Sequence, residues 1–162
     1  MSVSTLNELF VHTLKDMYYT EKLLVKKLPK MAKEATDSKL SHAFTSHLEE
    51  TKGHVERLER IFEILDKRPQ AKKCPAIDGI TKEAEETVKE IDDDATRDAA
   101  LIGGAGAAEH YEITRYGTLI AWAQELGLAA VIPLLQKTLE EEKAADAKLT
   151  QLAEGKLNRM AA

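Results

Sequence analysis

The chain has 162 residues, about the length of one domain, and such a chain can bury a sizeable core on folding. Its 23 basic and 28 acidic residues give a net charge of −5 and are interleaved, so no basic stripe or arm indicates a nucleic-acid partner. Apolar residues make up 43% of the chain and aromatic residues only 5%, and the abundance of Ala, Leu, Glu and Lys predicts an all-α fold.

The first predicted helix begins after Ser4 and runs to about Ala35, although Pro29 predicts a kink or an earlier end. Glu8 and Lys15 interrupt its apolar pattern, so the sequence shows no secretion signal. The residues on its inner face recur at spacings of three and four, and one of them is a carboxylate where a bundle needs an apolar side chain. This face consists of Leu6, Phe10, Thr13, Met17, Glu21, Leu24, Leu28 and Met31.

The second predicted helix begins near Asp37 and Ser38 and continues to the break at Arg68 and Pro69. Two histidines occupy its inner face, and Glu50 flanks that face between them. The face consists of Leu40, Phe44, His47, Thr51, His54, Leu58, Ile61 and Leu65.

Residues 67–79 contain two prolines and a glycine and are predicted to form the longest irregular connection of the chain. Cys74 is interpreted as an inert loop thiol, and a single cysteine cannot form an internal disulfide, which agrees with a reducing cytoplasm. A short helix from about Ile80 to Ile91 is predicted to lead through residues 92–94 into the third long helix, so that it forms part of a crossover.

The third long helix is predicted to end at Leu126, and two carboxylates lie on its inner face. Its glycines at positions 103, 104 and 106 follow no predicted strand, which argues against a phosphate-binding loop and favours close helix packing. The inner face consists of Ile102, Ala105, Glu109, Glu112, Tyr116, Leu119, Ala123 and Leu126.

The fourth long helix is predicted to follow a stop at Gly127 and to run almost to the C-terminus, with Pro133 in its first turns. Its apolar stretch at residues 129–135 is the longest in the chain and is too short to span a membrane. Glu141 replaces Glu142 on the inner face if the helix is rotated by one residue. The face consists of Leu128, Ile132, Leu135, Leu139, Glu142, Asp146, Leu149 and Ala153.

The acidic residues recur at matching depth in the two halves of the chain. Glu21 precedes Glu50 by 29 residues and Glu112 precedes Glu142 by 30, so a bundle of two helical hairpins would bring them into one layer. Buried like charges need a positive partner, and carboxylate and imidazole together suit iron, manganese or zinc. The candidate ligands of a metal pair are Glu21, His47, Glu50, His54, Glu109, Glu112, Glu142 and Asp146.

Three alternatives stay open at this level. The charged residues would instead be solvated surface groups if the helices were phased wrongly, and either His47 or His54 could be the nitrogen ligand. Tyr116, one turn beyond Glu112, is either a partner of the site that hydrogen-bonds a ligand or relays an electron, or an ordinary core tyrosine.

The segments DMYYTEKLL, HLEETKGHVERLE, AEHYEITRYGTL and LLQKTLEEEKAADAKLTQLA contain these residues and span nearly the whole chain. They resemble the ferritin-like superfamily, and more closely the bacterial stress-associated family typified by YciE and YciF. The resemblance implies one antiparallel four-helix-bundle domain with a dinuclear carboxylate site, commonly iron, and often a homodimer. The chain lacks the usual Glu-x-x-His spacing, since Gly53 follows Glu50 by three residues and Ala145 follows Glu142 by three.

The spacing of Glu109 and Glu112 resembles the doubled acid of rubrerythrin-like proteins, which reduce peroxide. The leading hypothesis is therefore a cytoplasmic di-iron protein of stress defence, with Glu112 and Tyr116 as the catalytic candidates and peroxide or dioxygen as the oxidant. Such a protein would oxidise ferrous iron or reduce peroxide. The alternatives are a manganese catalase-like enzyme and a non-catalytic helical scaffold or dimerisation module that binds metal incidentally; iron storage is disfavoured.

Overall fold

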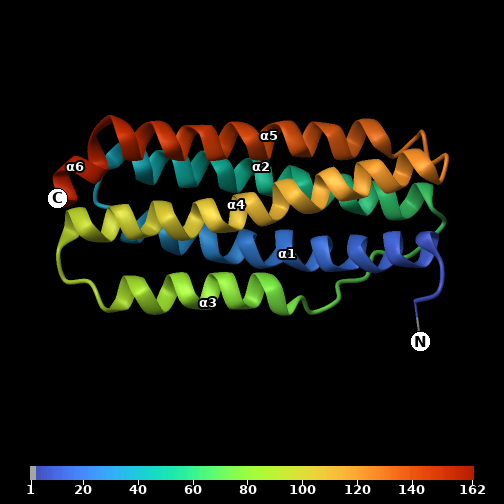
Figure 1. Ribbon diagram of the computed structural model, residues 1–162, viewed down its shortest axis with the longest axis horizontal. Helices are drawn as coiled ribbons and strands as arrows, with labels where there is room; N and C mark the ends of the chain where they lie inside the picture. The colour runs from blue at the N-terminus through green and yellow to red at the C-terminus, as the bar shows by residue number, and fades with distance from the viewer. Residues whose placement is uncertain (1–2) are drawn as a thin grey trace.

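A computed structural model describes residues 3–162, and within this range the chain is helical and contains no strand. Four long helices form an antiparallel bundle, and a shorter helix lies along its outside (Figure 1). This architecture confirms the predicted all-α bundle with an extra helix in the central crossover. The bundle helices are α1 (Leu6–Glu34), α2 (Ser38–Ile64), α4 (Asp94–Glu125) and α5 (Ile132–Leu152), and the outer helix is α3 (Pro75–Lys89).

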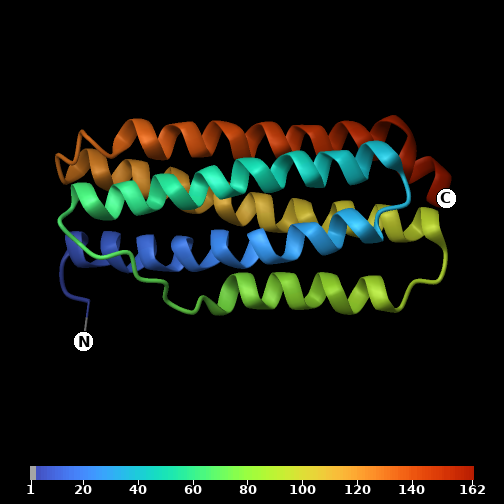
Figure 2. The ribbon, with the colours of Figure 1, turned by 180° about the vertical axis from the view of Figure 1, so that it is seen from behind.

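Each bundle helix packs against two antiparallel neighbours, in the cyclic order α1, α2, α5, α4. Viewed from behind, α1 and α2 form one hairpin and α4 and α5 the other, and the segment that contains α3 returns the chain to the end where α4 begins (Figure 2). The crossover therefore places the two hairpins so that the midpoints of all four helices lie at the same depth.

Side-chain caps determine where α1 and α2 begin. The cap of α1 is Thr5, one residue later than expected. Its hydroxyl accepts a hydrogen bond from the backbone N–H of Glu8, and the carboxylate of Glu8 accepts one from the backbone N–H of Thr5. Asp37 caps α2 as expected. Pro29 lies inside α1 without ending it.

The crossover differs most from its prediction. The helix α2 ends at Ile64 because Asp66 adopts a positive φ of 52°, which turns the chain out of the helix. The helix α3 begins at Pro75 rather than near Ile80, since a proline in the first helical turn removes no hydrogen bond that the helix needs. Cys74 is consequently buried at the start of α3, where its Sγ lies 3.0 Å from the hydroxyl of Tyr111.

The last hairpin turns where the sequence indicated. Gly127 has a φ of 69°, a conformation that a residue without Cβ adopts at no steric cost, and it follows α4 as the predicted stop. The helix α5 starts at Ile132 and passes at Ala153 into a single π-helical turn, Ala153–Leu157, which was not expected. The chain ends in the short helix α6 (Asn158–Ala161).

The buried apolar residues form two separate clusters, one toward each end of the bundle. One cluster is built around Phe10, Leu58 and Leu135, and the other around Leu28, Phe44 and Leu149. Between them lies a buried layer of charged residues at the midpoints of the long helices. None of the helices in residues 3–162 has the length and apolarity that crossing a membrane requires.

Candidate metal centre

Six buried ionisable residues from all four bundle helices form the layer between the two apolar clusters, here named the polar layer. The most exposed of them, His47, is only 7% exposed. The predicted phases of the helices therefore hold, because surface charges would point to solvent. The polar layer consists of Glu21 of α1, His47 and His54 of α2, Glu109 and Glu112 of α4, and Glu142 of α5.

The polar layer contains two groups of three residues whose ligand-type atoms lie within 4.8 Å of one another. In the first group, Nδ1 of His54 lies 2.9 Å from Oε1 of Glu142 and 3.3 Å from Oε2 of Glu21. In the second, Nε2 of His47 lies 3.0 Å from Oε1 of Glu109 and 3.4 Å from Oε2 of Glu142. Glu142 thus offers one oxygen to each group and joins them.

The carboxylates of the polar layer are poorly satisfied by hydrogen bonds. Glu112 is fully buried and neither of its oxygens has a hydrogen-bond partner, and the short approaches of Glu142 to the histidines lack hydrogen-bond alignment. Burial raises the pKa of Glu112 well above its ordinary value, and the negative charges of Glu142 and Glu21 raise it further. Burial likewise raises the pKa of Glu142 well above its ordinary value, although its contact with His54 opposes this.

Contacts with carboxylates favour the positively charged, doubly protonated form of both histidines in the metal-free protein. Burial alone would lower the pKa of His47, but contacts with Glu109 and Glu50 overcome this and raise it to about 11. Burial also opposes protonation of His54, and Glu21 and Glu142 raise its pKa to about 10. Two imidazolium groups therefore partly compensate the buried negative charge until a metal ion replaces their protons.

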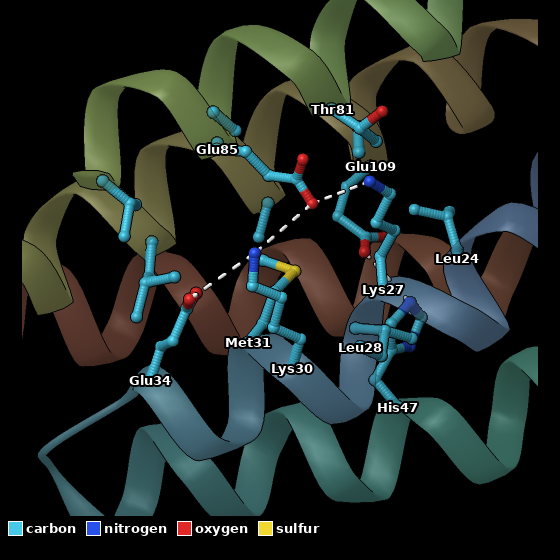
Figure 3. A pocket seen from close by; sticks show the side chains of 16 residues that line it. Leu24, Lys27, Leu28, Lys30, Met31, Glu34, His47, Thr81, Glu85 and Glu109 are labelled. Carbon is cyan, nitrogen blue, oxygen red and sulfur yellow. Dashed lines mark hydrogen bonds and ion pairs between the residues drawn. The ribbon is translucent and has the colours of Figure 1, made fainter.

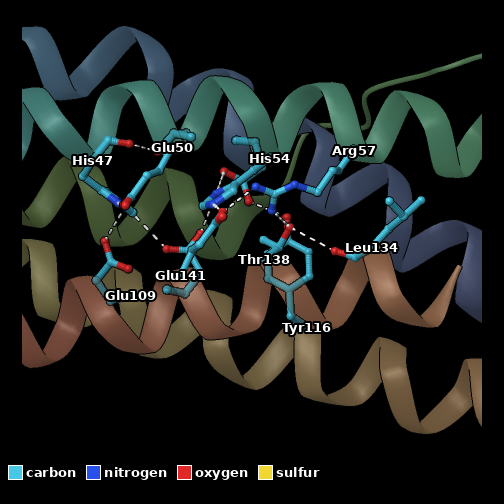
Figure 4. Close-up of polar contacts among 12 residues, drawn as sticks. His47, Glu50, His54, Arg57, Glu109, Tyr116, Leu134, Thr138 and Glu141 are labelled. Atoms are coloured by element: carbon cyan, nitrogen blue, oxygen red, sulfur yellow. Dashed lines mark hydrogen bonds and ion pairs between the residues drawn. The ribbon is translucent and has the colours of Figure 1, made fainter.

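Each histidine directs one ring nitrogen into the polar layer and the other toward an acidic side chain outside it (Figure 4). Nδ1 of His47 lies 3.1 Å from Oε2 of Glu50, whose side chain is 43% exposed. Glu50, a candidate ligand from the sequence, therefore lies on the outer side of His47 and belongs to neither group of three. At about 100° per residue, Glu50 is rotated about 60° from His47 and about 40° from His54 in the same direction, so it lies beside the face that the two histidines share.

The outer partner of His54 is Glu141, whose Oε2 lies 3.0 Å from Nε2 of the imidazole. Arg57 donates a hydrogen bond to the same oxygen and a second, of 2.7 Å, to the hydroxyl of Thr138. From the sequence, Glu141 is predicted only as a substitute for Glu142 on the inner face, and no role is predicted for Arg57. A basic residue one turn after His54, on a helix whose inner face carries histidines, was the signal that could have identified it.

Two further candidates from the sequence lie in different places: Asp146 lies outside the polar layer, whereas Tyr116 is buried against it. The structure does not bring Asp146 to the polar layer; its carboxylate lies 3.2 Å from the exposed His110. Four residues rotate a helix by about 400°, which carries Asp146 about 40° past Glu142 and toward the surface. Tyr116 is fully buried and donates a hydrogen bond to Oε1 of Glu21, and burial raises its pKa well above the ordinary value.

Two cavities reach the polar layer, and both reach it at His47 and Glu109. The first, here named the α3 cavity, has a volume of about 50 Å³, has mostly apolar walls, and lies between α1, α3 and α4 (Figure 3). At its outer side Nζ of Lys27 lies 2.7 Å from a carboxylate oxygen of Glu85. The second, here named the α5 cavity, has a volume of about 260 Å³, lies mainly between α2, α4 and α5, and also contacts Glu50.

Comparison with known proteins identifies the family of this chain. A family model described as a domain of unknown function, DUF892, matches residues 5–162. The chain belongs to the DUF892 family. It is 43% identical over 162 residues to Protein YciF of Escherichia coli strain K12, which covers 99% of this chain and 98% of that protein. The resemblance to the YciE and YciF family found in the sequence is therefore confirmed.

Solved structures of the family share the bundle. The crystal structure of the E. coli stress protein YciF has a TM-score of 0.91 at 43% identity and covers 96% of this chain and 99% of that one. YcfI from Rhodopseudomonas palustris has a TM-score of 0.91 at 50% identity and covers 92% of this chain and 95% of that one. The fold of the DUF892 chain described here is thus the fold of its relatives.

Proposed function

We propose that the polar layer binds two metal ions, iron in the first place, and that the loaded protein oxidises ferrous iron or reduces peroxide. The observation that carries this proposal is Glu112, a fully buried carboxylate with no hydrogen-bond partner for either oxygen. An ionised carboxylate in such a place is strongly destabilising unless a cation shares the site. A metal ion would supply both the missing ligand interaction and the missing charge.

The charge and the donor types of the polar layer fit a pair of divalent cations. Its four carboxylates carry four negative charges when ionised, which two divalent ions balance, and its two histidines are neutral when they bind metal. Four carboxylates and two histidines are also the donor set of di-iron and di-manganese bundle proteins. Geometry and donor type do not separate iron from manganese or zinc, so elemental analysis of protein purified from its native host is the test of metal identity.

The residues of the chain would divide the work as follows. Glu142, with one oxygen toward each histidine, would serve both metal positions, while Glu21 would serve the His54 position and Glu109 the His47 position. Tyr116 donates its hydroxyl proton to Glu21 and so holds that carboxylate in one orientation. When bound, an iron pair supplies the change between ferrous and ferric states, while the two apolar clusters exclude bulk water from both ends of the polar layer.

The α3 cavity gives this proposal a route for the oxidant. Its walls are mostly apolar, it is large enough for a molecule of few atoms, and its inner end is formed by His47 and Glu109. A neutral oxidant such as dioxygen or hydrogen peroxide can pass an apolar wall at lower cost than an ion can. The oxidant would therefore arrive at the His47 end of the polar layer.

The substitution Glu112→Gln tests the proposal because it keeps the shape of the side chain and removes one negative charge. The metal-free variant should melt at or above the temperature of the wild type, since repulsion within the polar layer falls. Its iron stoichiometry and its peroxide-dependent oxidation rate should both fall, because an amide is a poorer ligand and neutralises less charge. The matched control is Glu125→Gln, the same change at an exposed position of the same helix.

Three measurements on these proteins decide between the functions: bound iron, oxidation rate and the melting temperature without metal. Unchanged stoichiometry in Glu112→Gln together with absent turnover in the wild type would instead indicate a helical scaffold with incidental metal. A lower melting temperature of the metal-free variant would indicate that Glu112 is a structural hydrogen-bonding residue. High catalase turnover of a manganese-loaded wild type, with an inactive iron form, would favour the manganese enzyme.

A further inference from the structure

The two histidines of the polar layer have outer carboxylate partners that are held very differently. Glu141, the partner of His54, is also bound by Arg57, which is itself fixed by a 2.7 Å hydrogen bond to Thr138. Glu50, the partner of His47, is 43% exposed, and among residues 3–162 no lysine or arginine lies within ion-pair distance of it. His54 thus has a rigid outer support, whereas the support of His47 is free to move with solvent.

Exposure to solvent follows the same division. The side chains of His54, Glu21 and Glu142 have no exposed surface, and neither the α3 cavity nor the α5 cavity is lined by any of them. His47 and Glu109, in contrast, line both cavities. These two cavities therefore reach the polar layer at its His47 end and not at its His54 end.

An outer partner that fixes the orientation and the protonated nitrogen of a histidine raises its affinity for metal, because the free protein already holds the ring as the metal needs it. Glu141 accepts the Nε2–H of His54, which leaves Nδ1 for the ion between Glu21 and Glu142. Arg57 holds Glu141 in place by donating a hydrogen bond to the same oxygen that faces His54. The corresponding contact of Glu50 with His47 lacks this second link.

We propose that the two metal positions are unequal: the His54 position, supported by Glu141 and Arg57, binds the first ion tightly, and the His47 position binds the second ion weakly and exchangeably. Glu141 and Arg57 are then positioning residues for the first ion, and Glu50 is the positioning residue for the second. This inference rests on the proposed function only in that the polar layer must bind two ions. The weaker position is the one that the cavities bring into contact with small molecules.

Zinc titration of the metal-free protein tests the order directly. With ¹⁵N-labelled histidine, of which the chain has five, the first equivalent of Zn²⁺ should shift the imidazole signals of His54 and the second those of His47. Calorimetry of the same titration should resolve two steps of different affinity. The signals are assigned by single His→Gln variants.

Paired substitutions then assign each outer partner to its step. Glu141→Gln should weaken the first step by about 10- to 100-fold, and Glu50→Gln should weaken the second step and leave the first unchanged. Glu140→Gln and Glu49→Gln, the same changes at the exposed neighbouring positions, should alter neither step. Arg57→Gln leaves Glu141 in place but unanchored, and it should weaken the first step even if Glu141→Gln fails to fold.

The zinc titration distinguishes failure of the unequal-affinity proposal from failure of the metal-binding proposal. Two zinc ions that bind with His47 shifting first, or with one shared affinity, would overturn the inequality and leave the metal-binding proposal standing. Equal effects of Glu141→Gln and Glu50→Gln on the same step would also overturn it. A wild type in which zinc shifts neither histidine would overturn both proposals.

Discussion

Substituting Gly104 by alanine tests how tightly α3 is held against the bundle, and therefore how the α3 cavity is closed. A Cβ built on Gly104 lies 2.6 Å from the Cβ of Ala84 on α3, which is closer than two carbon atoms can approach. Ala84 has no flexible side chain that could move away, so α3 itself must shift. Both residues line the α3 cavity, and the shift would widen or distort it.

The expected change in stability follows from two opposing effects. Alanine in place of glycine inside a helix stabilises by about 0.5–1 kcal/mol, whereas overpacking typically destabilises by about 1–3 kcal/mol. Gly104→Ala should therefore lower the free energy of unfolding by roughly 1 kcal/mol and the Tm by about 2–4 °C for a chain of this length. The control is Gly103→Ala, where nothing lies within 4 Å of the added Cβ, and its Tm should rise by a similar amount.

Differential scanning calorimetry of the metal-free variants measures both shifts, and their opposite signs are the decisive result. The double variant Ala84→Gly with Gly104→Ala removes the clashing atom and should be more stable than the sum of the two single changes predicts. A Tm that rises equally in Gly104→Ala and Gly103→Ala would refute the close packing of α3 on α4.

The other predictions concern the helix ends and the charges of the polar layer. Thr5→Ala removes the cap of α1 and should cost about 1 kcal/mol, measured by urea unfolding. Asp98, 2% exposed, accepts three hydrogen bonds from residues 36 and 37, so Asp98→Asn should cost about 1–3 kcal/mol in the same assay, while Asp94→Asn at an exposed position should change little. Folding raises the pKa of His47 from 6.5 to about 11 and that of His54 from 6.5 to about 10. The contribution of the two histidines to the free energy of unfolding is therefore fully present below pH 6.5 and is lost as the pH rises toward these values. The metal-free Tm should fall between pH 7 and pH 10, and a constant Tm would contradict this; with zinc bound the protons are already displaced and the fall should be smaller.

Sequence periodicity was sufficient to predict the architecture because a bundle helix must present an apolar face over its whole length. Carboxylates and histidines at the midpoints of four such faces could reach only a shared layer, so Glu21, His47, His54, Glu109, Glu112 and Glu142 were found together. The same argument cannot resolve residues that lie beside a face rather than on it. Glu50 and Asp146 were assigned inward although each is rotated by tens of degrees, and only packing decides where such side chains go.

The sequence could not predict which side chains of different helices contact one another. The contact of Glu141 with His54 joins residues 87 positions apart, and that of Tyr116 with Glu21 joins residues 95 positions apart. Such pairs depend on the distance and rotation between two helices, which periodicity within one helix does not contain. The glycines at positions 103, 104 and 106 show the same limit, since the sequence predicts close packing for all three but only at Gly104 would an added Cβ meet another helix.

The polar layer divides the apolar core into two clusters, and this division bears on how the protein unfolds. Among residues 3–162 only Tyr111 is an apolar side chain that packs against both clusters, so we expect one end to loosen while the other stays packed. The metal-free chain would then open its two ends in separate events, with different rates of amide hydrogen exchange at each end. Ions bound at the midplane contact all four helices at once and would merge the two ends into one cooperative unit. Loading with metal would thus convert a molecule with two folding units into a molecule with one.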